Sequence, residues 1–310
     1  MVSEKKFFTE GSSWFGRIAW LTHTTALILR WVHAGAGHPP WTNLYESLVF
    51  FSWGTMSAHL FLEWRFDFKL SGVFATAVTF AAMGIASLHP HKEIEPLVPA
   101  LQSWWLFFHV FMACIAYAFF LAASSISIFY LLKDKVRVEV MAGYGALVCV
   151  LFLAIAAGKS FFLTGDIEFF KIAQLNGQSV INKKEFVSIP GAAWFFGLLL
   201  SLYLGSAVSL LTIKKDKIGK ILFTAAVAVH VALLINISLA PRWNPELALK
   251  SNPYRFAAII MTFIIAAYFL ALFKWKKVIL AKLPDEATLD RLGYEAILLG
   301  VPFMTLNLAS

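Results

Sequence analysis

The chain has 310 residues, of which 59% are hydrophobic and only 14% are charged, and its formal net charge at pH 7 is +8. A soluble domain carries about 25% charged residues, so this composition excludes an ordinary soluble fold and indicates a polytopic membrane protein. Only two cysteines occur, Cys114 and Cys149, both inside apolar runs and outside any CxxC motif, which excludes a disulfide framework and a cysteine-based metal site.

Apolar runs of roughly 20 residues, the length that crosses a bilayer as a helix, follow one another along the chain. The first dozen residues are polar and lead directly into such a run, so we expect no cleavable signal peptide. We predict an all-α transmembrane bundle of about nine helices, at residues 14–34, 43–64, 70–89, 104–132, 142–163, 192–213, 220–240, 255–273 and 293–310.

The segments between these helices fall alternately on two sides of the membrane, and the basic residues are divided unevenly between the sides. Seventeen of the 26 Lys and Arg residues lie on the side of the N-terminus. By the positive-inside rule that side is the cytoplasm, so we predict a cytoplasmic N-terminus. Topology then accounts for the net charge, and nucleic acid is not expected as a partner. The polar segment 164–191 is expected to be an external loop or surface helix.

The outer segment before the second helix reads GHPPWTNLYESLVFFSWG, residues 37–54. Asn43 and Glu46 have the spacing of a capping box, and Glu46 also suits the positive end of the helix dipole. A purely structural interpretation therefore exists. It leaves unexplained why His38, Trp41, Tyr45 and Glu46 gather at one point of the membrane interface, so His38, Trp41 and Glu46 also stand as candidate ligand-contacting residues.

A second outer stretch, LVPALQSWWLFFH at residues 97–109, leads from a polar loop into the fourth helix. Gln102 or Ser103 can cap this helix, and His109 follows Trp104 by about 7 Å along the axis. One interpretation is a histidine that reaches toward the lipid headgroups. The other is a neutral imidazole that serves as an axial ligand of haem iron, with Trp104 and Trp105 stacking on the macrocycle.

Other histidines lie inside the apolar runs, where ionisable groups are costly and are functional candidates. His23 is a candidate intramembrane ligand in the first helix, and His230 is a similar candidate in the seventh. His59 and Glu63 are more simply explained as an i,i+4 pair near the cytoplasmic end of the second helix.

Three pieces of the chain resemble one known family. AGHPPWTNLYESLVFFSWG (36–54) and LVPALQSWWLFFHV (97–110) are similar to the blocks SGH-P-x-x-NLYES-x-x-F-x-SWG and LVPALQS-x-W-L-x-x-HV of the CcsA/ResC family of cytochrome c assembly proteins. LDRLGYEAILLGVPFMTL (289–306) resembles the stretch that precedes that family's tryptophan-rich WWD segment. The three pieces occur in the family's order.

The resemblance implies a role in cytochrome c biogenesis. Such proteins act with a ResB/CcsB-type membrane partner, carry haem b to the outer face of the membrane, and support its covalent attachment to CxxCH thiols of apocytochrome c. The family's first external haem-ligand histidine corresponds to His109. The expected location is the bacterial inner membrane with the active face in the periplasm, and the thylakoid membrane is the alternative. The resemblance leaves open whether the chain is itself an enzyme or a component of the haem lyase system.

The resemblance covers only parts of the chain, and we divide the expected domain accordingly. We treat residues 1–310 as one transmembrane domain: 15–135 carry the family-like helices, 140–275 form four helices that match neither block, and 284–310 begin the helix that would lead to a WWD segment. That segment and the family's later histidines are absent from the chain. A fragment or split protein is one explanation. The alternative function is a membrane transporter or accessory subunit that shares the scaffold without ligating haem.

Overall fold

The computed structural model describes residues 2–34, 39, 43–88, 103–164, 167–175, 178–245, 247 and 253–309. Within these residues the chain forms nine α-helices, a short π-helix and a two-stranded antiparallel sheet. The predicted all-α bundle of about nine helices is confirmed. The helices group into two compact units, with unit 1 formed mainly by residues 1–87, 91–134 and 283–310 and unit 2 mainly by residues 135–282.

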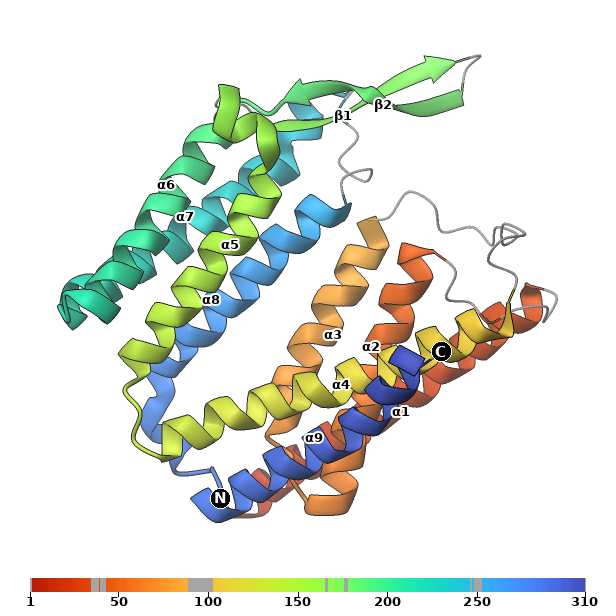
Figure 1. The fold of residues 1–310 in the computed structure, drawn as a ribbon, viewed down its shortest axis with the longest axis vertical. Helices are drawn as coiled ribbons and strands as arrows, with labels where there is room; N and C mark the ends of the chain where they lie inside the picture. The colour runs from red at the N-terminus through yellow and green to blue at the C-terminus, as the bar shows by residue number, and fades with distance from the viewer. Residues whose placement is uncertain are drawn as a thin grey trace. The chain divides into compact units, whose positions relative to one another are not determined.

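Unit 1 contains the first four helices and the last one (Figure 1). These are α1 (Val2–His33), α2 (Leu44–Phe66), α3 (Ser71–Leu88), α4 (Trp104–Lys133) and α9 (Glu286–Ala309). α1 packs on α2, α2 packs on α4, and α4 packs along α9. Helices that are about 150 residues apart in the sequence are thus neighbours in this unit, because α9 returns to α4 after the whole of unit 2 has been completed.

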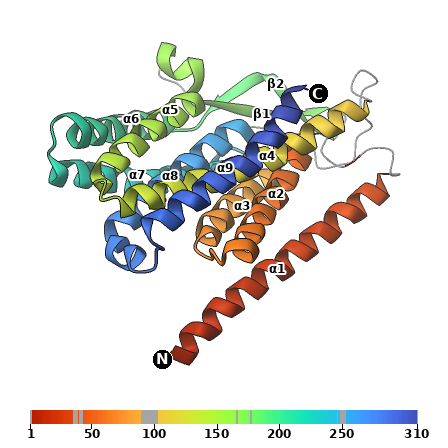
Figure 2. The ribbon, with the colours of Figure 1, turned by 60° about the horizontal axis from the view of Figure 1, so that its bottom comes forward.

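Small residues allow α4 and α9 to approach closely, and the two helices lie side by side in both ribbon views (Figures 1 and 2). A Cβ atom added at Gly300 of α9 would lie 2.6 Å from the ring of Phe120, and one at Gly293 would lie 3.7 Å from Ile126. At the end of the pair, the Nζ of Lys133 donates a hydrogen bond to the carbonyl oxygen of Leu283 at 3.4 Å. Small residues at such contacts are typical of helices that associate in lipid, where no hydrophobic driving force assists the packing.

Indole groups join α1 to α2 along the middle of the helices. The Nε1 of Trp20 donates to the hydroxyl of Ser57 at 2.7 Å, and the Nε1 of Trp53 donates to the hydroxyl of Thr24 at 2.8 Å. The rings of Trp20 and Trp53 stack with centroids 6.1 Å apart. Each indole therefore buries an apolar body while its single donor is satisfied.

Unit 2 is a four-helix arrangement with a hairpin. Its elements are α5 (Val138–Thr164), β1 (Glu168–Leu175), β2 (Gln178–Ser188), α6 (Ala192–Ala207), the π-helix Val208–Thr212, α7 (Asp216–Trp243) and α8 (Pro253–Leu280). α5 packs against α8 and α6, and α6 packs against α7. Phe196, Leu199 and Phe223 are fully buried in its core.

α5 is interrupted at Gly158, whose backbone has φ 76° and ψ 179°. This positive φ is readily available only to glycine. The break frees helical carbonyl groups, and Arg255 of α8 donates to the carbonyl oxygen of Ala157 at 3.4 Å. A neighbouring side chain thus satisfies part of the backbone that the break exposes, as the absence of water within a bilayer requires.

The segment 164–191 differs from its expectation, because most of it forms the antiparallel hairpin of β1 and β2 rather than a loop or surface helix. The register pairs Glu168 with Ser188 and Leu175 with Gln178. The sequence held a signal for this outcome: the dipeptide Asn-Gly at 176–177 separates two strand-like runs, which is a strong hairpin pattern.

Several helix limits also differ from the predicted ones. α1 begins at Val2 rather than residue 14, and α9 begins at Glu286 rather than residue 293. Both extensions are polar segments that a search for apolar runs passes over. Six described helices are long and apolar enough to cross a bilayer, namely α4, α5, α6 with its π-helix, α7, α8 and α9, and α3 is apolar but shorter. α1 and α2 contain charged residues that lower their hydropathy.

We expect Gly300→Val to destabilise the α4–α9 pair, because the added atoms meet the ring of Phe120 at a sub-van-der-Waals distance. Overpacking of this kind costs about 1–3 kcal/mol. Gly84→Val in α3 is the matched control, since a Cβ there has no heavy atom within 4 Å. Thermal unfolding in neutral detergent should show a lower midpoint for Gly300→Val than for Gly84→Val, and equal midpoints would contradict the tight contact.

Candidate functional site

The start of α4 presents the residues that the sequence singled out most strongly. Ser103 is the N-cap, with extended backbone angles and a hydroxyl that accepts a hydrogen bond from the backbone N–H of Trp105 at 3.3 Å. In the two turns that follow, Trp104 and Trp105 are 74% and 67% exposed, and His109 is exposed as well. A capped helix end thus displays two indoles and an imidazole on its surface.

Aromatic rings of this helix end form pairs along the helix. Trp104 meets Phe107 edge-on with centroids 5.6 Å apart, and Trp105 meets Phe108 in the same way at 6.2 Å. Both indoles remain largely exposed beside these neighbours. An apolar, flat ligand could stack against them.

The backbone of His109 is anchored by the last helix. The Nδ2 of Asn307, a side chain that is only 5% exposed, donates a hydrogen bond to the carbonyl oxygen of His109 at 2.7 Å. A buried amide is costly unless it is satisfied, so this contact fixes α9 against α4 at the level of the histidine. The sequence held a signal for this contact, because Asn307 is the one amide side chain in the apolar run 296–309.

Glu46 has a structural partner. Asn43 caps α2 by accepting the backbone N–H of Glu46 at 2.9 Å, which confirms the predicted cap. The Glu46 carboxylate, only 2% exposed, accepts hydrogen bonds from Arg30 of α1, with Nε at 2.9 Å and Nη2 at 2.8 Å. The guanidinium of Arg30 also lies 5.1 Å from the ring centre of Tyr45. This ion pair accounts for Glu46 without an external ligand.

The remaining candidates of this end are His23, His38 and Trp41. The buried Nε2 of His23 in α1 has no hydrogen-bond partner among the described residues. Glu46 is held by Arg30, and the backbone of His109 is held by Asn307. His38 and Trp41 lie outside the described residues.

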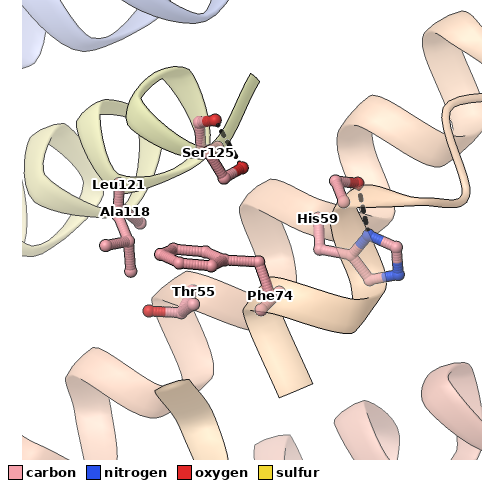
Figure 3. A pocket seen from close by; sticks show the side chains of 9 residues that line it. Thr55, His59, Phe74, Ala118, Leu121 and Ser125 are labelled. Carbon is pink, nitrogen blue, oxygen red and sulfur yellow. Dashed lines mark hydrogen bonds between the residues drawn. The ribbon is translucent and has the colours of Figure 1, made fainter. Parts of the chain in front are cut away.

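At the opposite end of α2, charged and polar groups form a continuous network in which His59, Glu63 and Ser71 are buried. The Nε2 of His59 lies 3.5 Å from the carboxylate of Glu63, which confirms the predicted i,i+4 pair, and the other carboxylate oxygen of Glu63 lies 3.3 Å from Arg17 of α1. The Nδ1 of His59 is 2.8 Å from the hydroxyl of Ser71 (Figure 3). Gly72 permits this position, since a Cβ there would lie 2.8 Å from the imidazole.

His59 also borders a small cavity of about 10 Å³, whose lining includes Thr55, Phe74 and Ser125 (Figure 3). This volume is close to what one water molecule requires. It is too small for a macrocycle, so the network serves to hold α1, α2 and α3 together. Across the described residues, no three His, Cys, Asp or Glu side chains converge to form a metal site.

His230 of α7 is also committed to internal contacts. It is fully buried, its Nε2 lies 3.1 Å from the carbonyl oxygen of Ile259, and its Nδ1 lies 3.5 Å from the hydroxyl of Tyr203. Both ring nitrogens thus have partners inside unit 2. Among the described histidines that the sequence nominated, His109 combines exposure with aromatic neighbours.

Comparison with known proteins agrees with the resemblance seen in the sequence. Residues 41–310 match the family described as "Cytochrome C assembly protein". Curated relatives include three proteins named "Cytochrome c biogenesis protein CcsA". That of Picosynechococcus sp. is 40% identical over 121 residues, covering 38% of this chain and 35% of the relative. That of Guillardia theta is 32% identical over 123 residues, covering 39% and 40%. That of Piper cenocladum is 42% identical over 110 residues, covering 34% and 33%.

The matched part of the chain spans about a third of the length of these relatives. No solved structure gives a significant match. The family match covers α2 to α9 and includes both units, so the helices of residues 140–275 lie within the matched range.

We expect Glu46→Ala to destabilise the protein by about 2–4 kcal/mol, because it leaves the Arg30 guanidinium without its carboxylate in a partly buried position. The double variant Arg30→Leu/Glu46→Leu should recover part of this loss, since both charges are then removed. Thermal unfolding of Glu46→Leu, Arg30→Leu and the double variant in detergent measures the coupling. Additive losses in the double variant would show that the two side chains do not act as a pair.

Proposed function

The chain belongs to the cytochrome c assembly protein family, and we propose that it serves cytochrome c biogenesis by presenting haem b on the outer face of the membrane for covalent attachment to apocytochrome c. The observation that carries this proposal is the family match over residues 41–310, which includes the helix end with His109. The alternative of a transporter or accessory subunit without a haem role is not favoured by this match.

His109 is assigned as one axial ligand of the haem iron in this proposal. Its side chain is exposed near the start of α4, and the hydrogen bond from Asn307 holds its backbone in place. An imidazole is a common axial ligand of haem iron. The exposed faces of Trp104 and Trp105 supply apolar surfaces on which the edge of the macrocycle can rest.

The contribution of these residues is positioning rather than acid–base chemistry. Coordination by His109 would hold the iron while the vinyl groups remain accessible to the thiols of a CxxCH motif. A fixed orientation converts an encounter of two molecules into a reaction between held partners, which accounts for a large part of many catalytic effects. A ResB/CcsB-type membrane protein is the proposed partner in delivery, and His23, His38 and Trp41 remain weaker candidates for contact with the haem along the route.

The proposed location is the bacterial inner membrane, with the start of α4 on the periplasmic side. The excess of basic residues on the side of the N-terminus supports this orientation. The relatives reported above come from a cyanobacterium, an alga and a plant, so a thylakoid location is the second possibility.

We expect His109→Ala to reduce the Soret absorbance of haem that co-purifies with the protein, because the iron loses an axial ligand. Added imidazole should restore part of the band by occupying the vacated coordination position. The measurement is absorbance per mole of protein purified from haem-replete membranes.

His33→Ala is the matched control for this test, since His33 is also an exposed histidine near a helix end and has no assigned role. It should leave the Soret band unchanged. An unchanged band in His109→Ala would overturn the ligand assignment. A loss in both variants would point to a general effect on folding or haem loading.

The proposed orientation predicts opposite results for reporters at two sites. Alkaline phosphatase inserted between β1 and β2 should be active, because that hairpin would lie outside, whereas the same enzyme inserted after Lys215 should be inactive. Green fluorescent protein at the two sites should give the reverse result. A fluorescent fusion at the hairpin would reverse the assigned topology and place the start of α4 in the cytoplasm.

A further inference from the structure

A groove of about 530 Å³ opens between the end of α2 and the beginning of α9, both in unit 1. Phe61, Arg65 and Phe66 line it from α2, while Arg291, Tyr294, Glu295, Leu298 and Leu299 line it from α9. Both helices pack on α4, which leaves this space between them. The volume is within the range that protein sites use for small ligands.

The groove is lined by two arginines and one carboxylate, so its formal charge is positive. Arg291 donates from its Nε to the carboxylate of Glu295 at 2.9 Å, so these two charges offset each other. Arg65 lies 5.2 Å from the ring centre of Phe66, and within the described part of the chain no carboxylate forms a salt bridge with it. The groove therefore offers one guanidinium that has no anionic partner and a second one close to the same opening.

The polarity of the groove changes along the helix axes. Arg65 is one residue from the end of α2, and Phe61 lies one turn further in, at about 6 Å along the axis. Arg291 is in the second turn of α9, and Leu298 lies about 10 Å further along the same helix. Cationic groups thus lie at the ends of the helices and apolar side chains follow, which is the order of a phospholipid from its headgroup to its acyl chains.

The groove is also open at the side of the helix pair. Tyr294 is 62% exposed, and Arg65 and Leu298 are exposed as well. In a bilayer this surface faces the lipid, and basic pockets between transmembrane helices bind anionic headgroups. Arginine is suited to this role because its planar guanidinium matches the geometry of phosphate oxygens.

We propose that this groove binds one anionic phospholipid, with its phosphodiester held by Arg65 and Arg291 and an acyl chain lying against Phe61 and Leu298. The lipid would bridge α2 and α9, which otherwise connect mainly through α4. This site lies at the basic end of the helices, opposite the helix end that carries His109, and the inference does not depend on the proposed role in haem presentation.

The test uses delipidated protein in neutral detergent and measures its thermal unfolding while phosphatidylglycerol or phosphatidylcholine is added. The phosphatidylglycerol should raise the unfolding midpoint in a saturable manner, and phosphatidylcholine should have little effect. In Arg65→Gln the concentration of phosphatidylglycerol that gives half of the effect should rise about tenfold, the value of one charge-assisted hydrogen bond. Lys277→Gln, which removes an exposed positive charge outside the groove, should match the wild type.

Other outcomes would overturn the proposal. If phosphatidylcholine raised the unfolding midpoint as much as phosphatidylglycerol, the net charge of the lipid would play no role. If inorganic phosphate raised it equally, the groove would be a site for anions rather than for a phospholipid. An unchanged half-effect concentration in Arg65→Gln would place the lipid elsewhere. If haem at equal concentration abolished the stabilisation by phosphatidylglycerol, the preferred occupant would be a porphyrin dicarboxylate. The comparison of the two lipids on the wild-type protein decides the charge preference even if the variant does not fold.

Discussion

Charged groups inside a bilayer must find partners within the protein, and this constraint organises the first half of unit 1. Two carboxylates of α2 are almost fully buried, Glu46 near its start and Glu63 near its end. Each is paired with an arginine of α1, Arg30 and Arg17 respectively. Because the two pairs lie at opposite ends of the helices, they fix both the antiparallel direction and the register of α1 against α2. The isolated charges would be strongly unfavourable there, so α1 cannot slide without separating one of the pairs.

Contacts with α2 and α9 hold the start of α4, which carries His109, in a fixed position. The Sγ of Cys114 in α4 approaches the carbonyl oxygen of Phe50 at 3.5 Å, and Gly54 leaves the room for it. Phe50 also meets Phe111 with ring centroids 6.0 Å apart, two residues beyond His109. Asn307 completes the arrangement from the other side. The side chain of His109 is therefore exposed although its helix is held from two directions.

The sequence predicted the number of helices well, because a span of apolar residues is a local property that length and hydropathy detect. It predicted less about what lies between helices. The cap at Asn43 followed from local spacing, whereas the ion pair of Glu46 with Arg30 joins two helices and could not be inferred from either one. The hairpin at 168–188 was missed although Asn-Gly marks its centre, because the polar segment was assigned by its position between two spans. His38 and Trp41 lie outside the described residues, so their expected roles stay predictions.

The two units also differ in how their polar side chains are used. In unit 2 several polar groups contact one another or the backbone: His230 contacts Tyr203 and the backbone of Ile259, the thiol of Cys149 lies 3.7 Å from the carbonyl oxygen of Thr262, and Arg255 contacts the backbone at the break in α5. Such networks specify how helices pack, since an unsatisfied group in an apolar medium costs several kcal/mol. A group committed in this way has no free lone pair for an iron atom. The proposed axial ligand His109 belongs to unit 1, where its imidazole lies on the surface of a helix that α2 and α9 hold in place.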